Sequence, residues 1–230
     1  MLRLRALAAV LSWILSCVLA CVLCCAPFAT VAAPLANTEI EQLCAQAEDA
    51  GHCGRLVEEA QLKRLPNLAR REGSALLVSL YPAGTATFTD SDDPVRGRSY
   101  SLWDYLDSIN AVLLYTTAGD KTTFTLLQRT NNQRYELPTE PQVSPDRQRL
   151  VTADICGPRC TNEIAVWRVS RDSIRKELAW SPDADWTDAA AKWKSAETLI
   201  IEYSVGNDLT AATLERRLGD ATWKRLPTSP

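Results

Sequence analysis

The pattern of apolar and polar positions divides the chain into three stretches. Residues 6–25 form an uninterrupted apolar run, residues 38–65 show helical periodicity, and from residue 74 onward short apolar runs alternate with polar turns. A helix repeats its buried positions every three to four residues, whereas a strand repeats them every two. The second stretch therefore predicts helix, and the third predicts β-structure.

The apolar run near the N-terminus has the layout of a secretory signal peptide. Arg3 and Arg5 precede it, no charge interrupts it, and small residues at 31–33 (Val-Ala-Ala) stand ahead of Pro34. This order predicts a signal peptide over residues 1–33 and export of the remaining chain. Two alternatives stay open. The run is about as long as the roughly 20 residues that span a bilayer, so it could be kept as an anchor, and Val-Leu-Ala-Cys at 18–21 resembles a lipobox that would anchor a lipid at Cys21.

Residues 34–73 are predicted to form a helical N-terminal segment. Thr38 and Glu41 have the spacing of a capping box, and apolar residues follow on one face. Gly51 and Gly54 interrupt this pattern, and a second helical piece then runs up to Pro66. The segment therefore predicts a short helical hairpin or a kinked helix.

Residues 74–230 are predicted to be a β-rich domain. The predicted strands are 75–81, 86–89, 111–117, 123–129, 134–137, 149–155, 163–170, 173–180, 198–205, 212–217 and 222–226. Gly119-Asp120 and Asn131-Asn132 have the chemistry of hairpin turns, and residues 185–194 predict one late helical turn. Because strands and helices do not alternate, the pattern predicts a mainly β, antiparallel domain.

A partial repeat adds detail to this prediction. Ser144-Pro145-Asp146 precedes two predicted strands, and Ser181-Pro182-Asp183 recurs before another pair. This unit resembles the blade of PD40/TolB-like and WD40-like β-propellers. The predicted strands are too few for the four blades of the smallest usual closed propeller, so the resemblance implies a partial propeller-like stack or a sandwich. The stretch from residues 62–66 (Leu-Lys-Arg-Leu-Pro) through 167–169 (Trp-Arg-Val) also resembles a group of secreted bacterial proteins, which implies fold and location but no activity.

The cysteines agree with export. Beyond the signal, the chain holds Cys44, Cys53, Cys156 and Cys160, an even number that predicts disulfides in an oxidising compartment. Proximity in sequence favours the pairs Cys44–Cys53 and Cys156–Cys160. The alternative is a redox-active pair in the second motif, Cys-Gly-Pro-Arg-Cys.

Charge argues against two classes of partner. The chain has 25 basic and 28 acidic residues, and the signal holds two arginines and no acid, so the mature part has a net charge of −5. Nucleic acids and anionic membrane surfaces are bound through clustered positive charge, so neither is expected as a partner. Lys63, Arg64, Arg70 and Arg71 form a local basic patch that is predicted to be a solvated face.

No catalytic or metal-binding motif is present. The only histidine is His52, and the sequence contains no nucleophile elbow, phosphate-binding loop, dinucleotide fingerprint or zinc-protease motif. The acidic loop at 90–93 (Asp-Ser-Asp-Asp) lacks the following Gly and distal Glu of a calcium loop. We therefore predict no catalytic residues, no metal and no cofactor.

Aromatic residues are the remaining candidates for a binding site. Trp186 and Trp193 are predicted to lie two helical turns apart on one face, and Tyr100, Trp103 and Tyr105 follow a charged loop. Each group could stack on a sugar or a peptide, or could simply pack in the core.

Two functional hypotheses follow from the sequence. The first is a non-enzymatic binding or interaction module that is periplasmic or secreted and binds an envelope protein or a small ligand. The alternative is a periplasmic hydrolase that uses acidic residues.

Overall fold

The computed structural model describes residues 33–93, 97–171, 173–182, 185–206 and 211–227. The described chain belongs to one compact unit, which begins at residue 33. Residues 1–32, which contain nearly all of the predicted signal peptide together with Cys21, lie outside the described residues, as does Asp183 of the second Ser-Pro-Asp turn.

Two helices begin the described chain and contact each other, as the sequence predicts. They are α2 (Asn37–Cys44) and α3 (Ala50–Arg64). The Cys44–Cys53 disulfide joins them, with its Cα atoms 4.6 Å apart. The Asp49 side chain accepts a hydrogen bond of 2.8 Å from the backbone N–H of His52, which caps the first turn of α3.

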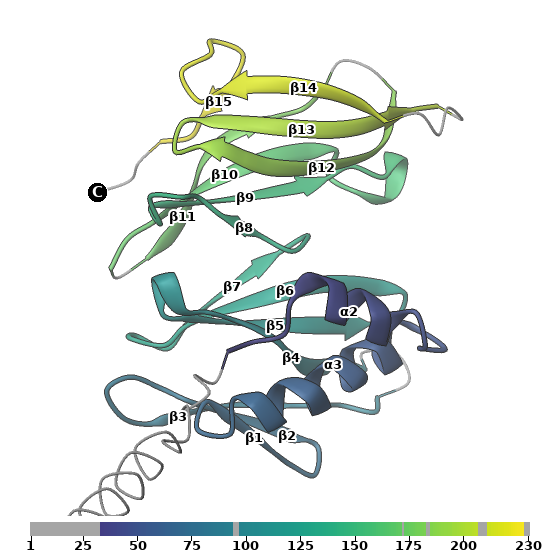
Figure 1. Ribbon diagram of the computed structural model, residues 1–230, viewed down its shortest axis with the longest axis vertical. Helices are drawn as coiled ribbons and strands as arrows, with labels where there is room; N and C mark the ends of the chain where they lie inside the picture. Colours follow the sequence, from purple (N-terminus) through teal and green to yellow (C-terminus); the bar gives the residue numbers. More distant parts are fainter. Residues whose placement is uncertain (1–32, 94–96, 172, 183–184, 207–210, 228–230) are drawn as a thin grey trace, which may run out of the picture. The chain divides into compact units, whose positions relative to one another are not determined.

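In the described residues, fifteen strands form four antiparallel sheets (Figure 1). The first sheet contains β1 (Ala69–Glu72), β2 (Ala75–Ser79) and β3 (Thr85–Thr89), and the second contains β4 (Ser99–Leu106), β5 (Ala111–Ala118), β6 (Lys121–Gln128) and β7 (Gln133–Leu137). The third contains β8 (Gln142–Val143), β9 (Arg149–Asp154), β10 (Glu163–Val169), β11 (Ile174–Trp180) and β15 (Lys224–Arg225), and the fourth contains β12 (Trp186–Ser195), β13 (Thr198–Val205) and β14 (Ala212–Arg217).

Strands that are neighbours in a sheet are neighbours in sequence, except that β15 returns to pair with β11. The predicted mainly β, antiparallel class is therefore confirmed. The propeller-like arrangement inferred from the repeat stays a prediction.

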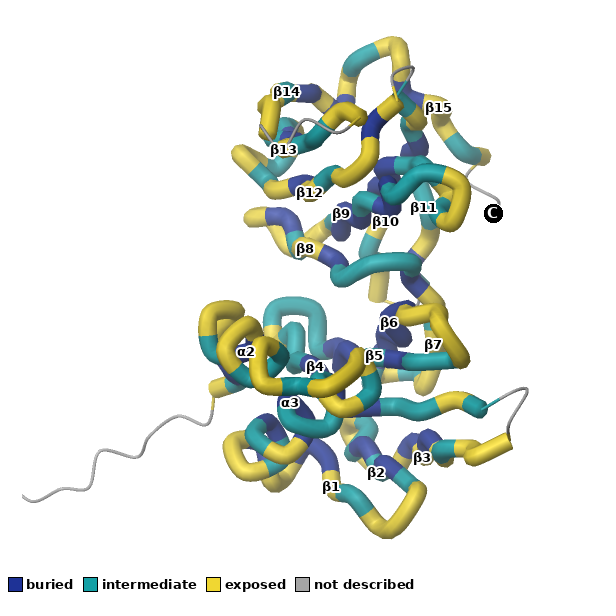
Figure 2. The backbone as a smooth tube through the Cα atoms, turned by 90° about the vertical axis from the view of Figure 1, so that its right-hand side faces the viewer, coloured by how far each residue is buried: buried dark blue, intermediate teal, exposed yellow. Residues whose placement is uncertain are grey.

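Three hydrophobic clusters lie between the four sheets. The first sheet packs on one face of the second, and the other face of the second sheet shares a cluster with both helices and the third sheet. The opposite face of the third sheet packs against the fourth. Because the second sheet is covered on both sides, β5 and β6 are buried along most of their length (Figure 2). Each fully buried leucine in such a strand contributes about 1.5–3 kcal/mol to folding.

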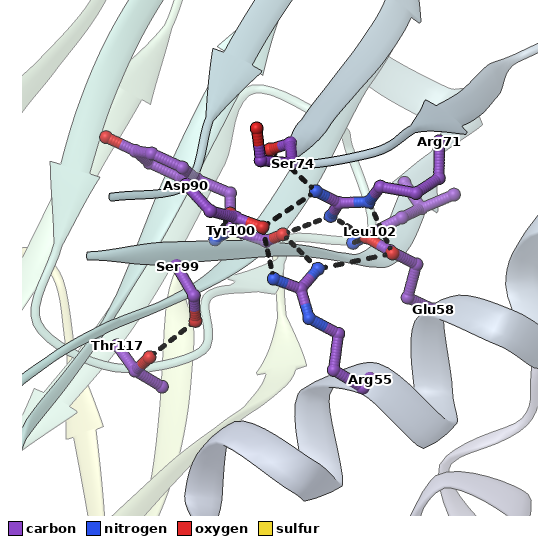
Figure 3. A network of polar contacts seen from close by, with 9 residues as sticks. All are labelled: Arg55, Glu58, Arg71, Ser74, Asp90, Ser99, Tyr100, Leu102 and Thr117. Carbon is purple, nitrogen blue, oxygen red and sulfur yellow. Dashed lines mark hydrogen bonds and ion pairs between the residues drawn. The ribbon is translucent and has the colours of Figure 1, made fainter. Parts of the chain in front are cut away.

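A network of ion pairs attaches α3 to the first two sheets (Figure 3). The Glu58 carboxylate, 5% exposed, accepts hydrogen bonds from Arg71 at 2.6 and 2.9 Å, from Arg55 at 3.3 Å and from the backbone N–H of Leu102 at 3.0 Å. Both arginines also reach Asp90, at 2.5 and 3.0 Å. The sequence predicted that Arg71 would belong to a solvated basic patch and Asp90 to an exposed acidic loop. In the structure both residues join the ion pairs that hold α3, β1 and the segment after β3 together.

The prediction of a helical turn at 185–194 is wrong, because this segment is strand β12. Its alanines favour helix, but pairing with β13 along its length overrides that preference. A bulge between Trp186 and Asp188 restores the alternation, so that Trp186, Ala191 and Trp193 all pack on the third cluster.

Other element boundaries also differ from the predictions. Strands β1, β4 and β8 were not predicted as such, and β1 lies within the segment 34–73 that was predicted to be helical. The capping box at Thr38 and Glu41 is wrong, because α2 begins at Asn37 and the Glu39 carboxylate accepts from the Ala36 N–H at 2.9 Å.

Both predicted disulfides are present. Cys156–Cys160 closes a turn around the short helix η2 (Gly157–Arg159), with its Cα atoms 5.3 Å apart. Two disulfides in one domain are typical of an extracytoplasmic protein. Among the described residues, no helix is both long and apolar enough to span a membrane.

Candidate functional site

The candidate site is a cavity of about 440 Å³, named here the Glu140 cavity. Six segments meet there: the start of α2, the loop between β7 and β8, strand β8, strand β9, the Cys156–Cys160 loop and strand β12. Its walls come from Asn37, from Thr139, Glu140 and Gln142, from residues 151 and 153–156, from Cys160, and from residues 188–192. The cavity therefore depends on contacts between segments that are far apart in sequence.

Glu140 is the ionisable residue in these walls whose pKa is shifted. Burial raises the pKa of its carboxyl, the indole N–H of Trp103 acts against this, and the nearby Asp104 carboxylate raises the pKa further. Asp104 is also half-buried, and burial raises its pKa as well. Carboxyl groups with perturbed pKa values in a cavity often mark functional sites.

One buried polar atom beside Glu140, Thr139 Oγ1, has no hydrogen-bond partner among the described residues. Most buried polar atoms in folded proteins are hydrogen-bonded. Because Thr139 lines the cavity, its hydroxyl is available to a ligand.

The cavity is bordered by unpaired strand edges. β8 pairs with only residues 150 and 151 of β9, so the edge of β9 at 152–154 has no strand partner on that side within the described sheets. β12 is the outer strand of the fourth sheet, and its residues 188–192 line the same cavity. Unpaired strand edges carry free N–H and C=O groups that can pair with another extended chain.

The disulfide loop supplies a rigid wall. The Asp154 carboxylate accepts hydrogen bonds from the Thr161 N–H at 2.8 Å and from the Thr161 hydroxyl at 2.6 Å. Asn162 donates a hydrogen bond of 2.7 Å from its side-chain amide to the carbonyl of Gly157, which has a φ of +71° that favours glycine. Together with the disulfide, these bonds fix the loop that borders the cavity.

The two tryptophans of β12 have different surroundings. Trp186 is buried, stacked on Tyr203 with ring centroids 3.9 Å apart, and it meets Trp180 edge-on at 5.5 Å. Trp193 is half-buried, and its indole N–H donates a hydrogen bond of 2.8 Å to the carbonyl of Gln142. This bond ties β12 to β8 at the border of the Glu140 cavity.

The aromatic residues of β4 do not form one platform. Tyr100 packs on Phe88 at 5.3 Å, in the cluster between the first two sheets. Trp103 lies at a bulge and is buried in the cluster on the other side, stacked 4.9 Å from Tyr115. The Tyr105 hydroxyl donates a hydrogen bond to Asn110 at 3.1 Å. The five predicted aromatic residues are thus distributed over three clusters.

Sequence reasoning did not single out Glu140 or Thr139. They occur in a Pro-Thr-Glu-Pro segment at 138–141 that has the composition of an ordinary loop. An acid between two prolines is a weak signal, because the residues that act on Glu140, Trp103 and Asp104, lie elsewhere in the sequence.

Comparison with protein-family models, with curated proteins and with solved structures finds no match for this chain.

Proposed function

We propose that this protein is an exported, non-enzymatic binding module whose Glu140 cavity accepts an extended segment of a partner protein. The observation that carries the proposal is that two strand edges without a partner in the described sheets, those of β9 and β12, line one cavity. A peptide added to a strand edge gains affinity from main-chain hydrogen bonds and specificity from alternate side chains. On this proposal the module works in the periplasm or is secreted, where its disulfides are stable.

The charges in the walls of the Glu140 cavity favour a partner segment that carries positive charge. Glu140, Asp154 and Asp188 contribute carboxyl groups, whereas the one lysine in the walls, Lys192, pairs with Glu202 at 3.2 Å. A lysine or arginine on the partner would therefore meet unbalanced negative charge. It would also favour the ionised form of Glu140.

The test uses synthetic octapeptides of alternating valine and lysine, titrated into the protein and followed by fluorescence anisotropy. The Glu140→Gln/Asp188→Asn double variant is expected to weaken binding at least about tenfold, because it removes two attractive charges. The control is Glu59→Gln/Asp120→Asn, which changes net charge equally at exposed positions away from the cavity. N-methylation of alternate peptide bonds should also abolish binding. No binding by the parent peptide, or equal weakening by the control, would overturn the proposal.

One observation favours a second candidate, a hydrolase that uses acidic residues. Burial and the nearby Asp104 raise the pKa of Glu140, and a carboxyl group with a raised pKa can act as a general acid. Turnover of peptidoglycan fragments by the protein, lost in Glu140→Gln, would support this candidate. Absence of turnover would remove it.

A further inference from the structure

A second cavity, of about 240 Å³, is lined by both the second and the third sheet and is named here the Trp167 cavity. Strands β6 and β7, with the following Pro138, contribute one side of it. Strands β9, β10 and β11, together with Thr161, contribute the other side. The described residues that line this cavity are all different from those that line the Glu140 cavity.

The alternation along β10 places an aromatic ring and a carboxylate on either side of a small residue. Glu163, Ala165 and Trp167 lie two positions apart, so their side chains share one face of the strand, and all three line the cavity. On β9, Thr152 is directly opposite Ala165, and its side chain is also small. The floor of the cavity is therefore formed by two small side chains, between the ring of Trp167 and the carboxylate of Glu163.

The indole of Trp167 is held in place by its neighbours. Its N–H donates a hydrogen bond of 3.0 Å to the hydroxyl of Thr152. Lys176 is directly opposite Trp167 on β11, and its ammonium group lies 5.2 Å from the centroid of the indole ring. Trp167 is half-buried, because it packs on the cluster between the second and third sheets and also lines the cavity. An indole that is already fixed offers a large contact area and loses little conformational entropy when a ligand binds.

The polar groups of the described walls include both donors and acceptors. Lys176 pairs with Glu163 at 2.5 Å, and Lys121 faces Glu136 at 4.0 Å. Thr123 adds a hydroxyl group, which can both donate and accept. A charged ligand would be attracted to one member of each ion pair and repelled by the other. These walls therefore favour an uncharged ligand that itself carries donors and acceptors.

We propose that the Trp167 cavity binds one ring of an uncharged sugar, at a site separate from the one proposed for a partner segment. A sugar ring has an apolar C–H face and a rim of hydroxyl groups, each of which both donates and accepts. The C–H face packs on the indole, whose electron-rich face attracts weakly positive hydrogens. The hydroxyl groups bind Glu163 and Lys176 through charge-assisted hydrogen bonds. The cavity is smaller than the about 300–1,000 Å³ of typical small-molecule sites, so it holds about one ring of a longer glycan.

The test is saturation-transfer difference NMR of the full protein with maltotriose, cellotriose and chitotriose. At least one trisaccharide should receive saturation, concentrated on the C–H protons of one ring. The paired variant Glu163→Ala/Lys176→Ala should weaken this binding at least about tenfold, because it removes two charged hydrogen-bonding groups and leaves neither charge unpaired. The matched control is Lys194→Ala/Glu215→Ala, which removes an ion pair of the same length, 2.5 Å, from the fourth sheet. Both variants leave the net charge unchanged, and the control residues line neither cavity.

The role of the indole is tested by two substitutions of Trp167. Trp167→Phe keeps an aromatic face and should keep binding within about threefold, whereas Trp167→Leu should weaken it at least about tenfold. If Trp167→Leu does not fold, the Glu163→Ala/Lys176→Ala variant decides the test. The Glu140→Gln/Asp188→Asn variant should bind the trisaccharide as the parent does. No saturation of any of the three trisaccharides, or equal weakening by the control or by the Glu140→Gln/Asp188→Asn variant, would overturn the proposal.

Discussion

The ion pairs around Glu58 predict how strongly two adjacent residues of α3, Glu58 and Glu59, differ in their contribution to stability. Glu58 is 5% exposed and accepts four hydrogen bonds, three of them from arginines. Glu59, the next residue, is 68% exposed and pairs with Lys63, itself 72% exposed, at 2.7 Å. The same substitution to glutamine can therefore be made at both positions, in the same helix.

The expected magnitudes differ widely. In Glu58→Gln, the amide nitrogen faces donors and cannot accept their hydrogen bonds, and Arg71, 18% exposed, loses its main counter-charge. Breaking a buried ion pair at one partner costs about 3–5 kcal/mol. Arg71 keeps Asp90 at 3.0 Å, so we expect the lower end of this range, about 3 kcal/mol. Glu59→Gln should change stability very little, because exposed helical ion pairs contribute little to folding.

The assay is urea denaturation followed by circular dichroism, with both disulfides oxidised. A loss of about 3 kcal/mol should also lower the melting temperature by about 6–12 °C in a domain of this size. The reasoning is refuted if Glu58→Gln and Glu59→Gln differ by less than about 1 kcal/mol, since surface substitutions already vary by about 0.5 kcal/mol.

Three further predictions follow. Gly54→Ala should destabilise the protein by about 1–3 kcal/mol in the same assay. The new Cβ would lie 2.9 Å from Tyr115 Cδ1 and 3.0 Å from Ser101 Oγ, so the neighbouring side chains would have to move. Gly51→Ala is the control: its Cβ would meet only the end of a flexible side chain, so stability should change by less than about 1 kcal/mol. Reduction of the nine-residue disulfide between the helices should cost about 2–3 kcal/mol, and an unchanged melting temperature in reductant would contradict this. Because burial raises the pKa of Glu140, the folded state holds its proton more tightly than the unfolded state, and the free energy of unfolding should fall as pH rises from the ordinary glutamate pKa through the raised one. Glu140→Gln should therefore gain stability relative to the parent as pH rises through this interval, and a difference that does not change with pH would count against it.

Local chemistry determined much of the fold. Turn residues predicted hairpins where the structure has them, since Gly119 (φ +58°) and Asn132 (φ +59°) occupy the left-handed region at the turns after β5 and β6. The Cys44–Cys53 and Cys156–Cys160 disulfides followed from short separation in sequence. The apolar alternation predicted the mainly β class, because burial on one face of a strand leaves a period of two in the sequence itself.

Only the tertiary structure decided which positions became the candidate sites. Residues 185–194 have helical propensity, and their pairing with β13 made them a strand that borders the Glu140 cavity. Glu140 acquired its raised pKa because distant segments bury it, and Trp167 met Lys176 through strand register. Such effects depend on distances between residues far apart along the chain. A single sequence records local preferences, whereas burial and charge balance at a site arise from packing.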